Sequence, residues 1–181
     1  MKIMKTIGTH SGIFHADEVV AVMLLKNFVK EFKDATIIRT RDPKILKDLD
    51  ILVDVGGVYD HDLKRYDHHQ KGFVSTYKEE KKTKLSSAGL VFMHYGIEII
   101  EEAINYIFDD LKIFPLKYKQ IPNADQLKSF QDIVYDAFIE SIDGIDNGLN
   151  RYPKDVKPAY NDSYTDLISR IGRLNKKPIQ L

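Results

Sequence analysis

Residues 50–57 of the chain, DILVDVGG, decide its fold. A compact apolar run that ends in paired glycines is typical of a buried strand in a parallel sheet. Upstream, the sequence predicts in order a strand, a helix, a strand and a short helix, over residues 3–9, 15–32, 35–40 and 41–49. In the short helix, Asp42 can be the cap and Pro43 the first helical residue. This alternating order predicts an α/β fold with an open, mainly parallel sheet flanked by helices.

Downstream of the paired glycines, the chain predicts a long polar loop followed by two long helices. Residues 58–84 are polar and loop-like, apart from a short strand near Asp67. The two helices cover residues 86–111 and 125–148. The first is amphipathic and therefore has one face for a core, and the second ends in residues typical of helix ends.

The length of the chain, 181 residues, is enough for one domain with a core of its own. The second long helix ends at Gly148, so the predicted division is one domain over residues 1–150 and a helical tail over residues 151–181. The tail can be the start of a further C-terminal domain.

Composition excludes several kinds of site. The chain has no cysteine, so a metal must be held by imidazole and carboxylate groups rather than by thiolates. Its 27 basic and 27 acidic residues cancel, which removes the global electrostatic argument for a duplex-DNA or membrane-surface binder. No long apolar run or secretory signal is present, so we expect a soluble intracellular protein, in a compartment that these features do not specify.

Acidic and imidazole side chains fall where ligands bind in such a fold, beyond the carboxyl ends of the strands. His10 leaves the first strand, His15 and Asp17 stand at the start of the first helix, and Asp54 ends the apolar strand. Two imidazoles and a carboxylate within eight residues suit Mn²⁺, Fe²⁺ or Zn²⁺. A carboxylate at the end of a buried strand needs a partner or a metal. Ordinary helix and turn capping are the alternatives for these residues.

A second group of polar side chains lies in the stretch YDHHQ, residues 66–70. Neighbouring residues of an extended segment point to opposite sides, so His68 and His69 are predicted to differ in role, one as a metal ligand and the other facing a substrate or a supporting partner. The alternative is a surface histidine pair. His61 is predicted at the surface and His94 in the packing of a helix.

Two further acids, Asp143 and Asp146, end the second long helix three residues apart and hence on one face. Either of them can complete a metal site, and a solvated helix end is the alternative. Together, these histidines and carboxylates supply enough nitrogen and oxygen donors for two adjacent metals bridged by a carboxylate. Two-metal sites of this composition activate a water and bind the oxygens of a phosphoryl group.

Several spaced blocks of the chain match known proteins in order: GTHSGIFHADEVVAVMLL, RTRDP, ILVDVGGVYD, RYDHHQKGF, TKLSSAGLVF, DGIDNG and SRIGRLN. The chain resembles the DHH phosphoesterase superfamily and, within it, the melanocyte-proliferating-gene family of metal-dependent hydrolases. The blocks span nearly the whole chain. This resemblance implies that residues 1–150 are a DHH-type catalytic domain that holds two divalent ions, usually Mn²⁺, at the strand ends. Such a domain hydrolyses a phosphoester or phosphoanhydride with metal-activated water.

The resemblance also implies roles for single residues. The implied metal ligands are His10, His15, Asp17, Asp54, His68 and Asp146, with Asp143 as the competitor for the last position. The implied catalytic residues are Asp54, which bridges the metals, His68, and His69, which faces the phosphate. Related pyrophosphatases usually have an aspartate where His15 stands, in a motif one residue shorter, so the first metal can be bound differently here.

The family resembles 3′-to-5′ exonucleases that act on RNA, so single-stranded RNA or a short oligonucleotide is the implied substrate. Arg39 and Arg41 can bind its phosphates, and Ser86 and Ser87 can present backbone N–H groups to an anion at a helix N-terminus. Surface charge and ordinary capping are the alternatives for these four residues. Two other functions are kept open: a small-molecule phosphatase that acts on pyrophosphate or nucleotides, and a non-catalytic domain that a metal stabilises.

Overall fold

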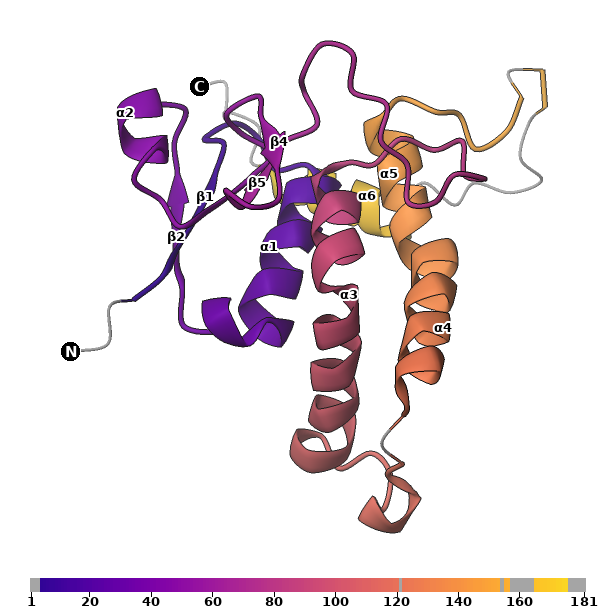
Figure 1. The fold of residues 1–181 in the computed structure, drawn as a ribbon. Helices are drawn as coiled ribbons and strands as arrows, with labels where there is room; N and C mark the ends of the chain where they lie inside the picture. Colours follow the sequence, from indigo (N-terminus) through magenta and orange to yellow (C-terminus); the bar gives the residue numbers. More distant parts are fainter. Residues whose placement is uncertain (1–3, 121, 154, 157–164, 176–181) are drawn as a thin grey trace, which may run out of the picture.

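A five-stranded sheet organises the fold, with the strand order β2-β1-β3-β5-β4 (Figure 1). The computed structural model describes residues 4–120, 122–153, 155–156 and 165–175. The strands are β1 (Thr6–Thr9), β2 (Thr36–Arg39), β3 (Ile51–Val53), β4 (Tyr59–Asp60) and β5 (Arg65–Tyr66). Strands β2, β1, β3 and β5 run parallel, and β4 pairs antiparallel with β5. The predicted α/β fold with an open, mainly parallel sheet is therefore confirmed.

Helices flank the sheet on both faces (Figure 1). The larger layer contains α1 (Ala16–Phe28), α3 (Ser87–Asn105), α4 (Ala124–Val134) and α5 (Glu140–Asp146), and α6 (Leu167–Leu174) packs against α1. The short α2 (Pro43–Leu46) lies with a separate small core that includes Leu52 of β3. Short helical segments complete the chain: the 3₁₀ turns η1 (Lys30–Phe32) and η3 (Leu116–Tyr118), and the π-helical η2 (Tyr106–Asp110) and η4 (Tyr135–Ile139).

The apolar run of β3 is explained by its central place in the sheet. Ile51 and Val53 face the large core that α1 and α3 cover, whereas Leu52 faces the small core with Leu46 and Leu49. All three residues of the strand are buried because helices cover both faces. The helix before β3, α2, begins as predicted, with Asp42 as its cap and Pro43 as its first residue.

Both long helices of the sequence prediction are present, each with a π-helical segment. Residues 86–111 form α3 followed by η2, and residues 125–148 form α4, η4 and α5. The short strand predicted near Asp67 is β5, whereas the prediction for residues 58–84 missed β4, which forms a hairpin with it. Strand β5 places residues 67–69 at the same edge of the sheet as the ends of β1 and β3.

The tail predicted over residues 151–181 is described in part. Residues 154, 157–164 and 176–181 lie outside the described residues. The described part includes α6, whose Ile171 is buried in the large core. None of the helices in the described ranges is long and apolar enough to cross a membrane.

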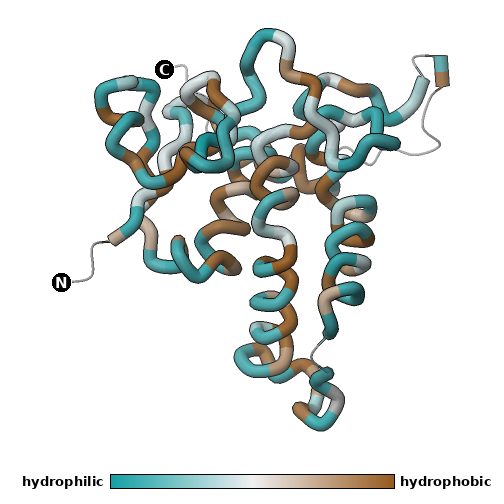
Figure 2. Tube along the Cα trace, in the orientation of Figure 1, coloured by the Kyte–Doolittle hydropathy of each residue, from teal (hydrophilic) through white to brown (hydrophobic). Residues whose placement is uncertain are grey.

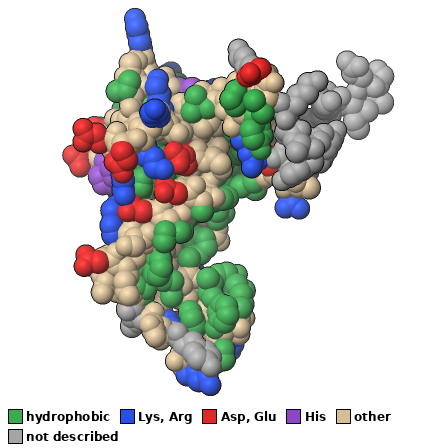
Figure 3. Space-filling view, turned by 90° about the vertical axis from the view of Figure 1, so that its right-hand side faces the viewer, with side chains coloured by type: hydrophobic (Ala, Val, Ile, Leu, Met, Phe, Trp, Pro, Cys, Tyr) green, Lys and Arg blue, Asp and Glu red, His purple; other side chains and the backbone are tan. Residues whose placement is uncertain are grey.

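Hydrophilic residues cover the outer turns and loops, and apolar residues concentrate where the helices meet one another and the sheet (Figure 2). The space-filling view shows a further apolar patch at the far end of the helical layer, over the segment that joins α3 to α4 (Figure 3). Four side chains of that segment are about half exposed or more: Leu111, Ile113, Phe114 and Leu116.

A buried carboxylate joins α5 to the start of α3. One oxygen of Asp143 accepts hydrogen bonds from the N–H of Ser86 (2.9 Å), the hydroxyl of Ser86 (2.7 Å) and the N–H of Gly89 (3.1 Å). Its other oxygen accepts from the hydroxyl of Tyr135 (2.9 Å). This junction fixes the position of α5 and therefore of the residues at its end.

The junction requires a glycine at position 89. A Cβ atom added to Gly89 would lie 2.3 and 2.4 Å from the two carboxylate oxygens of Asp143. We expect Gly89→Ala to lower the free energy of unfolding by about 2–3 kcal/mol, because the carboxylate must move away from its donors. Urea denaturation measures this change. The matched control is Gly172→Ala in α6, where an added Cβ meets nothing within 4 Å. That variant should be neutral or more stable by up to about 1 kcal/mol, and equal stability of both variants would contradict the prediction.

Candidate metal centre

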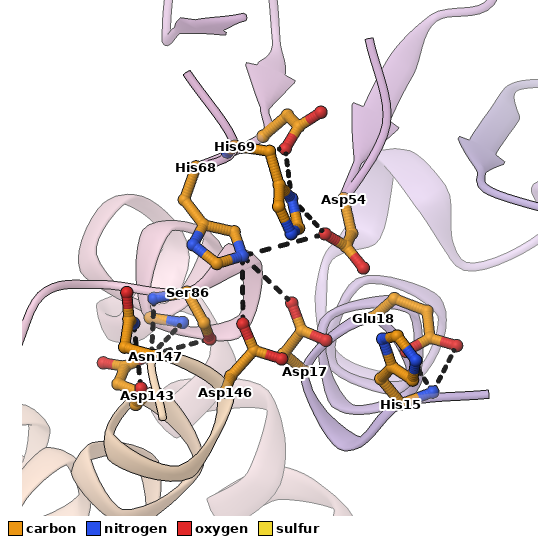
Figure 4. Close-up of polar contacts among 12 residues, drawn as sticks. His15, Asp17, Glu18, Asp54, His68, His69, Ser86, Asp143, Asp146 and Asn147 are labelled. Atoms are coloured by element: carbon orange, nitrogen blue, oxygen red, sulfur yellow. Dashed lines mark hydrogen bonds and ion pairs between the residues drawn. The ribbon is translucent and has the colours of Figure 1, made fainter. Parts of the chain in front are cut away.

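Side chains that belong to or follow five elements converge at the carboxyl edge of the sheet, and Figure 4 shows most of them. His10 follows β1, Asp54 follows β3, and His68 lies two residues beyond β5. Asp17 is in the first turn of α1 and Asp146 is the last residue of α5. Because the parallel strands end at one edge, residues far apart in the sequence become neighbours.

Asp54 lies between the imidazoles of this cluster. One of its oxygens, Oδ2, is 3.3 Å from His10 Nε2, and the other, Oδ1, is 3.1 Å from His69 Nδ1 and 3.8 Å from His68 Nε2. Its backbone has φ = +54°, in the left-handed region that residues other than glycine seldom adopt. Backbone strain of this kind, of order 1 kcal/mol or more, is found at functional sites, where the surroundings hold the residue in place.

The side chain of His68 connects the strand edge to α5. Its Nε2 atom is 3.0 Å from Asp146 and 3.9 Å from Asp17. Burial lowers the pKa of His68, but the contact with Asp146 and the nearby negative charges outweigh burial, so its pKa lies above the ordinary value. The contact with Asp146 therefore favours the protonated imidazole.

Three buried carboxyl groups of the cluster resist ionisation when no cation is present, whereas in Asp146 burial is outweighed by the contact with His68, which lowers the pKa. Burial, and then the charges of Asp54 and Asp146, raise the pKa of Asp17 well above its ordinary value. Burial and the charge of Asp146 raise the pKa of Asp54 to about 8, and burial raises that of Glu18 to about 7. Clustered buried carboxylates need a compensating positive charge.

Several buried atoms of the cluster make no well-aligned hydrogen bond within the described part of the chain, although two of them have an ion-pair contact at 3.0–3.1 Å: His10 Nε2, both carboxylate oxygens of Asp17, Asp54 Oδ1 and His68 Nε2. Buried polar atoms are almost always paired, so this set requires an explanation. A divalent cation supplies one, because imidazole nitrogens and carboxylate oxygens are the donors that Mn²⁺, Fe²⁺ and Zn²⁺ accept. The residues present therefore fit a metal.

Three overlapping donor groups have ligand atoms within 4.8 Å of one another. They are His10, His15, Glu18 and Asp54; Asp54, His68 and His69; and His15, Asp17 and Asp146. Asp54 and His15 each belong to two groups, so both residues can link neighbouring positions.

Glu18 belongs to the first donor group although it was not among the predicted site residues. Its side chain is buried, accepts hydrogen bonds from the N–H of His15 through both oxygens (2.9 and 2.8 Å), and lies 3.6 Å from His10 Nε2. An acid in the first turn of a helix is ordinary, and the sequence signal was only its position next to Asp17.

Asp67 orients His69 without entering any of the donor groups. The carboxylate of Asp67 accepts from Gly57 N–H (2.6 Å) and from His69 N–H (2.9 Å), and it also lies 2.9 Å from His69 Nδ1. The side chain of His69 is 62% exposed, whereas that of His68 is buried. The second ring nitrogen of His69, Nε2, is therefore the one available to a substrate.

Of the two arginines predicted to bind phosphate, Arg39 is engaged in contacts within the protein and Arg41 lines a cavity. Arg39 donates to the carbonyl oxygens of His10 (3.1 Å) and Gly12 (2.6 Å), and its guanidinium stacks on the Phe14 ring at 3.9 Å. Arg39 thus braces the loop that follows β1. Arg41 is exposed and lines a cavity of about 340 Å³ that also includes Asp54 and His69.

Asp143, Ser86 and Ser87 are placed at the α3 junction. Asp143 is fully buried and holds Ser86, and both serines are fully buried as well. The structure brings Asp146, and not Asp143, next to His68.

The two histidines assigned no metal role lie together elsewhere. His61 is exposed, His94 is half-buried in α3, and their rings stack at 3.7 Å. His94 Nε2 lies 2.7 Å from the hydroxyl of Tyr59. The predicted surface and packing roles agree with these positions.

Asn175, at the C-terminal end of α6, holds the loop that leads to His15. Asn175 Oδ1 accepts from the N–H of Phe14 (2.6 Å), and Asn175 Nδ2 donates to the carbonyl oxygen of Phe14 (2.8 Å). The amide of Asn175 therefore fixes the backbone next to His15.

Nearly the whole sequence matches one known protein family. The profile named MYG1 exonuclease, described as an uncharacterised protein family (UPF0160), matches residues 6–180. The chain belongs to the MYG1 family. The resemblance to the melanocyte-proliferating-gene family is thereby confirmed at the level of the family.

MYG1 relatives from distant organisms are similar over nearly the whole chain. A MYG1 protein of Dictyostelium discoideum is 42% identical over 94% of this chain, and one of Caenorhabditis elegans is 44% identical over 93%. The MYG1 exonuclease of Homo sapiens is 38% identical over 93% of this chain. The matched regions are 46%, 46% and 42% of these relatives, so the chain spans less than half of their length. No solved structure matches the chain.

The Asn175 contact predicts an effect on metal binding in this MYG1-family chain. We expect Asn175→Ala to weaken Mn²⁺ binding by about three- to tenfold, because the loop between His10 and His15 loses two hydrogen bonds. Titration followed by Mn²⁺ electron paramagnetic resonance measures the affinity. The matched control is Asn27→Ala, which removes an exposed hydrogen bond to Met23 on α1 and should leave the affinity unchanged. An unchanged affinity in Asn175→Ala would contradict the prediction.

The raised carboxyl pKa values predict a pH dependence of stability without metal. The folded state favours the protonated forms of Glu18 and Asp54, so their contribution is present at low pH and is lost as the pH rises through about 7 and 8. His68 acts in the same direction, since its pKa is also raised. We expect the unfolding temperature in EDTA to fall by roughly 5 °C between about pH 6.5 and 9.

Mn²⁺ should reverse this fall, and its stabilisation should be larger at about pH 8.5 than at about pH 6.5, because metal and protons compete for the same donors. Glu18→Gln, which removes one titrating group, should make the fall in EDTA smaller. An unfolding temperature in EDTA that stays constant over this pH range would show that the carboxyl groups of the cluster do not repel one another as described.

Proposed function

We propose that the chain is a metal-dependent phosphoesterase of the DHH type that removes nucleotides from the 3′ end of single-stranded RNA or short oligonucleotides. The observation that carries this proposal is the set of buried nitrogen and oxygen atoms around Asp54 that make no well-aligned hydrogen bond within the described part of the chain. A purely structural acid would be paired, as Asp143 is. The names of the mammalian MYG1 relatives, which call them exonucleases, favour a nucleic acid among the phosphate esters.

We assign the metal positions to the converging donors: His10, His15, Asp17, Asp54, His68 and Asp146, with Glu18 as an additional candidate. Asp54 has its two oxygens directed to different imidazoles, which suits a bridge between two ions. Two divalent ions, of which Mn²⁺ fits this donor set, would supply activation of a water and neutralisation of the phosphoryl oxygens when bound.

The other groups of the site act on the substrate. Asp67 holds His69 through Nδ1, so His69 can direct Nε2 to a phosphoryl oxygen. Arg41 adds a positive charge in the same cavity, where a guanidinium can bind a phosphate through two N–H groups. In the reaction, the water oxygen bonds to phosphorus, the bond from phosphorus to the 3′ oxygen of the preceding nucleotide breaks, and that oxygen takes up a proton.

We further propose that residues 1–150 are the catalytic domain. Every assigned donor lies within them. The described part of the tail contributes Asn175, which holds the loop before His15. The described part of the tail therefore supports the site through this contact and contains none of the assigned donors.

Hydrolysis of RNA tests the proposal directly. A 5′-labelled single-stranded RNA incubated with the protein and Mn²⁺ should give a ladder that shortens from the 3′ end. EDTA should abolish the ladder, and Asp54→Asn should slow its formation by at least about 100-fold, because the bridging charge is lost. The control Asp62→Asn changes an exposed acid in the turn between β4 and β5 and should leave the rate unchanged.

Other substrates distinguish the alternative enzyme. Release of phosphate from pyrophosphate, without shortening of RNA, would replace the exonuclease by a small-molecule phosphatase. Bound Mn²⁺ with no hydrolysis of RNA, dinucleotides or pyrophosphate would leave a metal-stabilised domain without catalysis.

Substitution of His69 distinguishes a loss of catalysis from a loss of metal-dependent stability. Because its side chain is 62% exposed, we expect His69→Ala to change the free energy of unfolding by less than about 0.5 kcal/mol. The same change should reduce the rate of RNA hydrolysis by about 100-fold or more, because Nε2 no longer contacts the phosphate. Asp54→Asn should instead lose both turnover and Mn²⁺-dependent stabilisation. A fully active His69→Ala variant would remove His69 from the mechanism.

A further inference from the structure

An apolar groove adjoins the metal centre on the side of α5 and α6. Its volume is about 520 Å³, and it is lined mainly by aliphatic and aromatic side chains of the loop after β1 and of these two helices. Ile13 is 65% exposed and Ile145 is 46% exposed, so both present apolar surface to this space. His15 and Asp146, which belong to the donor groups, line the groove as well.

The polar cavity of the site begins at the same histidine. His15 lines both the groove and the 340 Å³ cavity that contains Arg41 and His69. The two spaces differ in chemistry, because one has cationic and metal-ligating groups and the other has exposed isoleucines. A ligand that occupies both must carry an anionic group and an apolar group that are close to each other.

We propose that the groove is the binding site for the base of the terminal nucleotide. The proposal rests on the proposed function only in placing the phosphate at the donor cluster. It narrows the substrate class to nucleotides and oligonucleotides, because pyrophosphate and polyphosphate have no apolar part to cover Ile13 and Ile145. A nucleobase does, since its flat face can be buried against aliphatic side chains.

The lining of the groove also predicts tolerance of different bases. The amide of Asn175, which lines the groove, already exchanges two hydrogen bonds with the backbone of Phe14. Aliphatic contact does not distinguish the hydrogen-bonding edges of the four bases, whereas every base has an apolar face. The groove therefore suits an enzyme that removes nucleotides irrespective of sequence.

Gly172 offers a way to fill the groove without disturbing the core. It lines the groove from α6, and an added Cβ meets nothing within 4 Å. Its backbone is helical with no positive φ, so a leucine is compatible with the local conformation. Gly172→Leu adds bulk to the groove, and Ile145→Ser removes apolar surface from it.

Isothermal titration of the Mn²⁺-loaded full chain with AMP and with ribose 5-phosphate isolates the contribution of the base. We expect AMP to bind about tenfold more tightly than ribose 5-phosphate. In Gly172→Leu and in Ile145→Ser, the ratio should fall below about threefold, with the affinity for ribose 5-phosphate unchanged. The matched control is Ile133→Ser on α4, which alters an isoleucine that is 59% exposed and should keep the ratio of the unmodified protein.

Equal affinities for AMP and ribose 5-phosphate, or no binding of AMP at millimolar concentration, would overturn the proposal. A ratio that neither groove variant changes would overturn it too, because the base would then bind elsewhere. Hydrolysis of RNA tests the proposed function independently of the base site. Selective AMP binding without hydrolysis of RNA would refute the exonuclease and keep the base site, whereas RNA hydrolysis with equal affinities would do the reverse.

Discussion

The hydrogen bonds to Asp143 fix α5 against the start of α3. Burial raises the pKa of this carboxyl to about 6, and the four hydrogen bonds from Ser86, Gly89 and Tyr135 offset the cost of holding it in the core. Asp146 follows three residues later, at the end of the same helix, and contacts His68. The position of Asp146 therefore depends on the hydrogen bonds of Asp143, which is not one of the proposed metal donors.

The sheet provides the second constraint, because its parallel strands deliver His10, Asp54 and His68 to one edge. These donors are neighbours of Asp17, which is buried in the first turn of α1. Burial and the neighbouring carboxylates raise the pKa of Asp17 and Asp54, so the protein folds around two acids that are costly to ionise in the absence of a cation. The same arrangement that destabilises the metal-free cluster favours a divalent ion, since the ion replaces protons and neutralises the repulsion.

The sequence was sufficient to predict the sheet and which acidic and imidazole residues meet at its strand ends, because a parallel sheet necessarily brings those ends together. It was not sufficient to distinguish Asp143 from Asp146. Both lie on one helix face, and what separates them is the close approach of Asp143 to Gly89, a contact 54 residues apart in the chain. Glu18 was missed because an acid in the first helical turn is common, and its proximity to His10 arises only in the folded chain.

The loop between His10 and His15 couples the metal centre to the groove beside it. Arg39 holds the loop from β2, through the carbonyl oxygens of His10 and Gly12. Asn175 holds it from the end of α6, 161 residues away in sequence. His15, at the end of this loop, borders both the polar cavity and the apolar groove. A shift of α6 therefore changes the two spaces together. The described end of the tail, α6 with Asn175, thus affects both spaces through the same backbone.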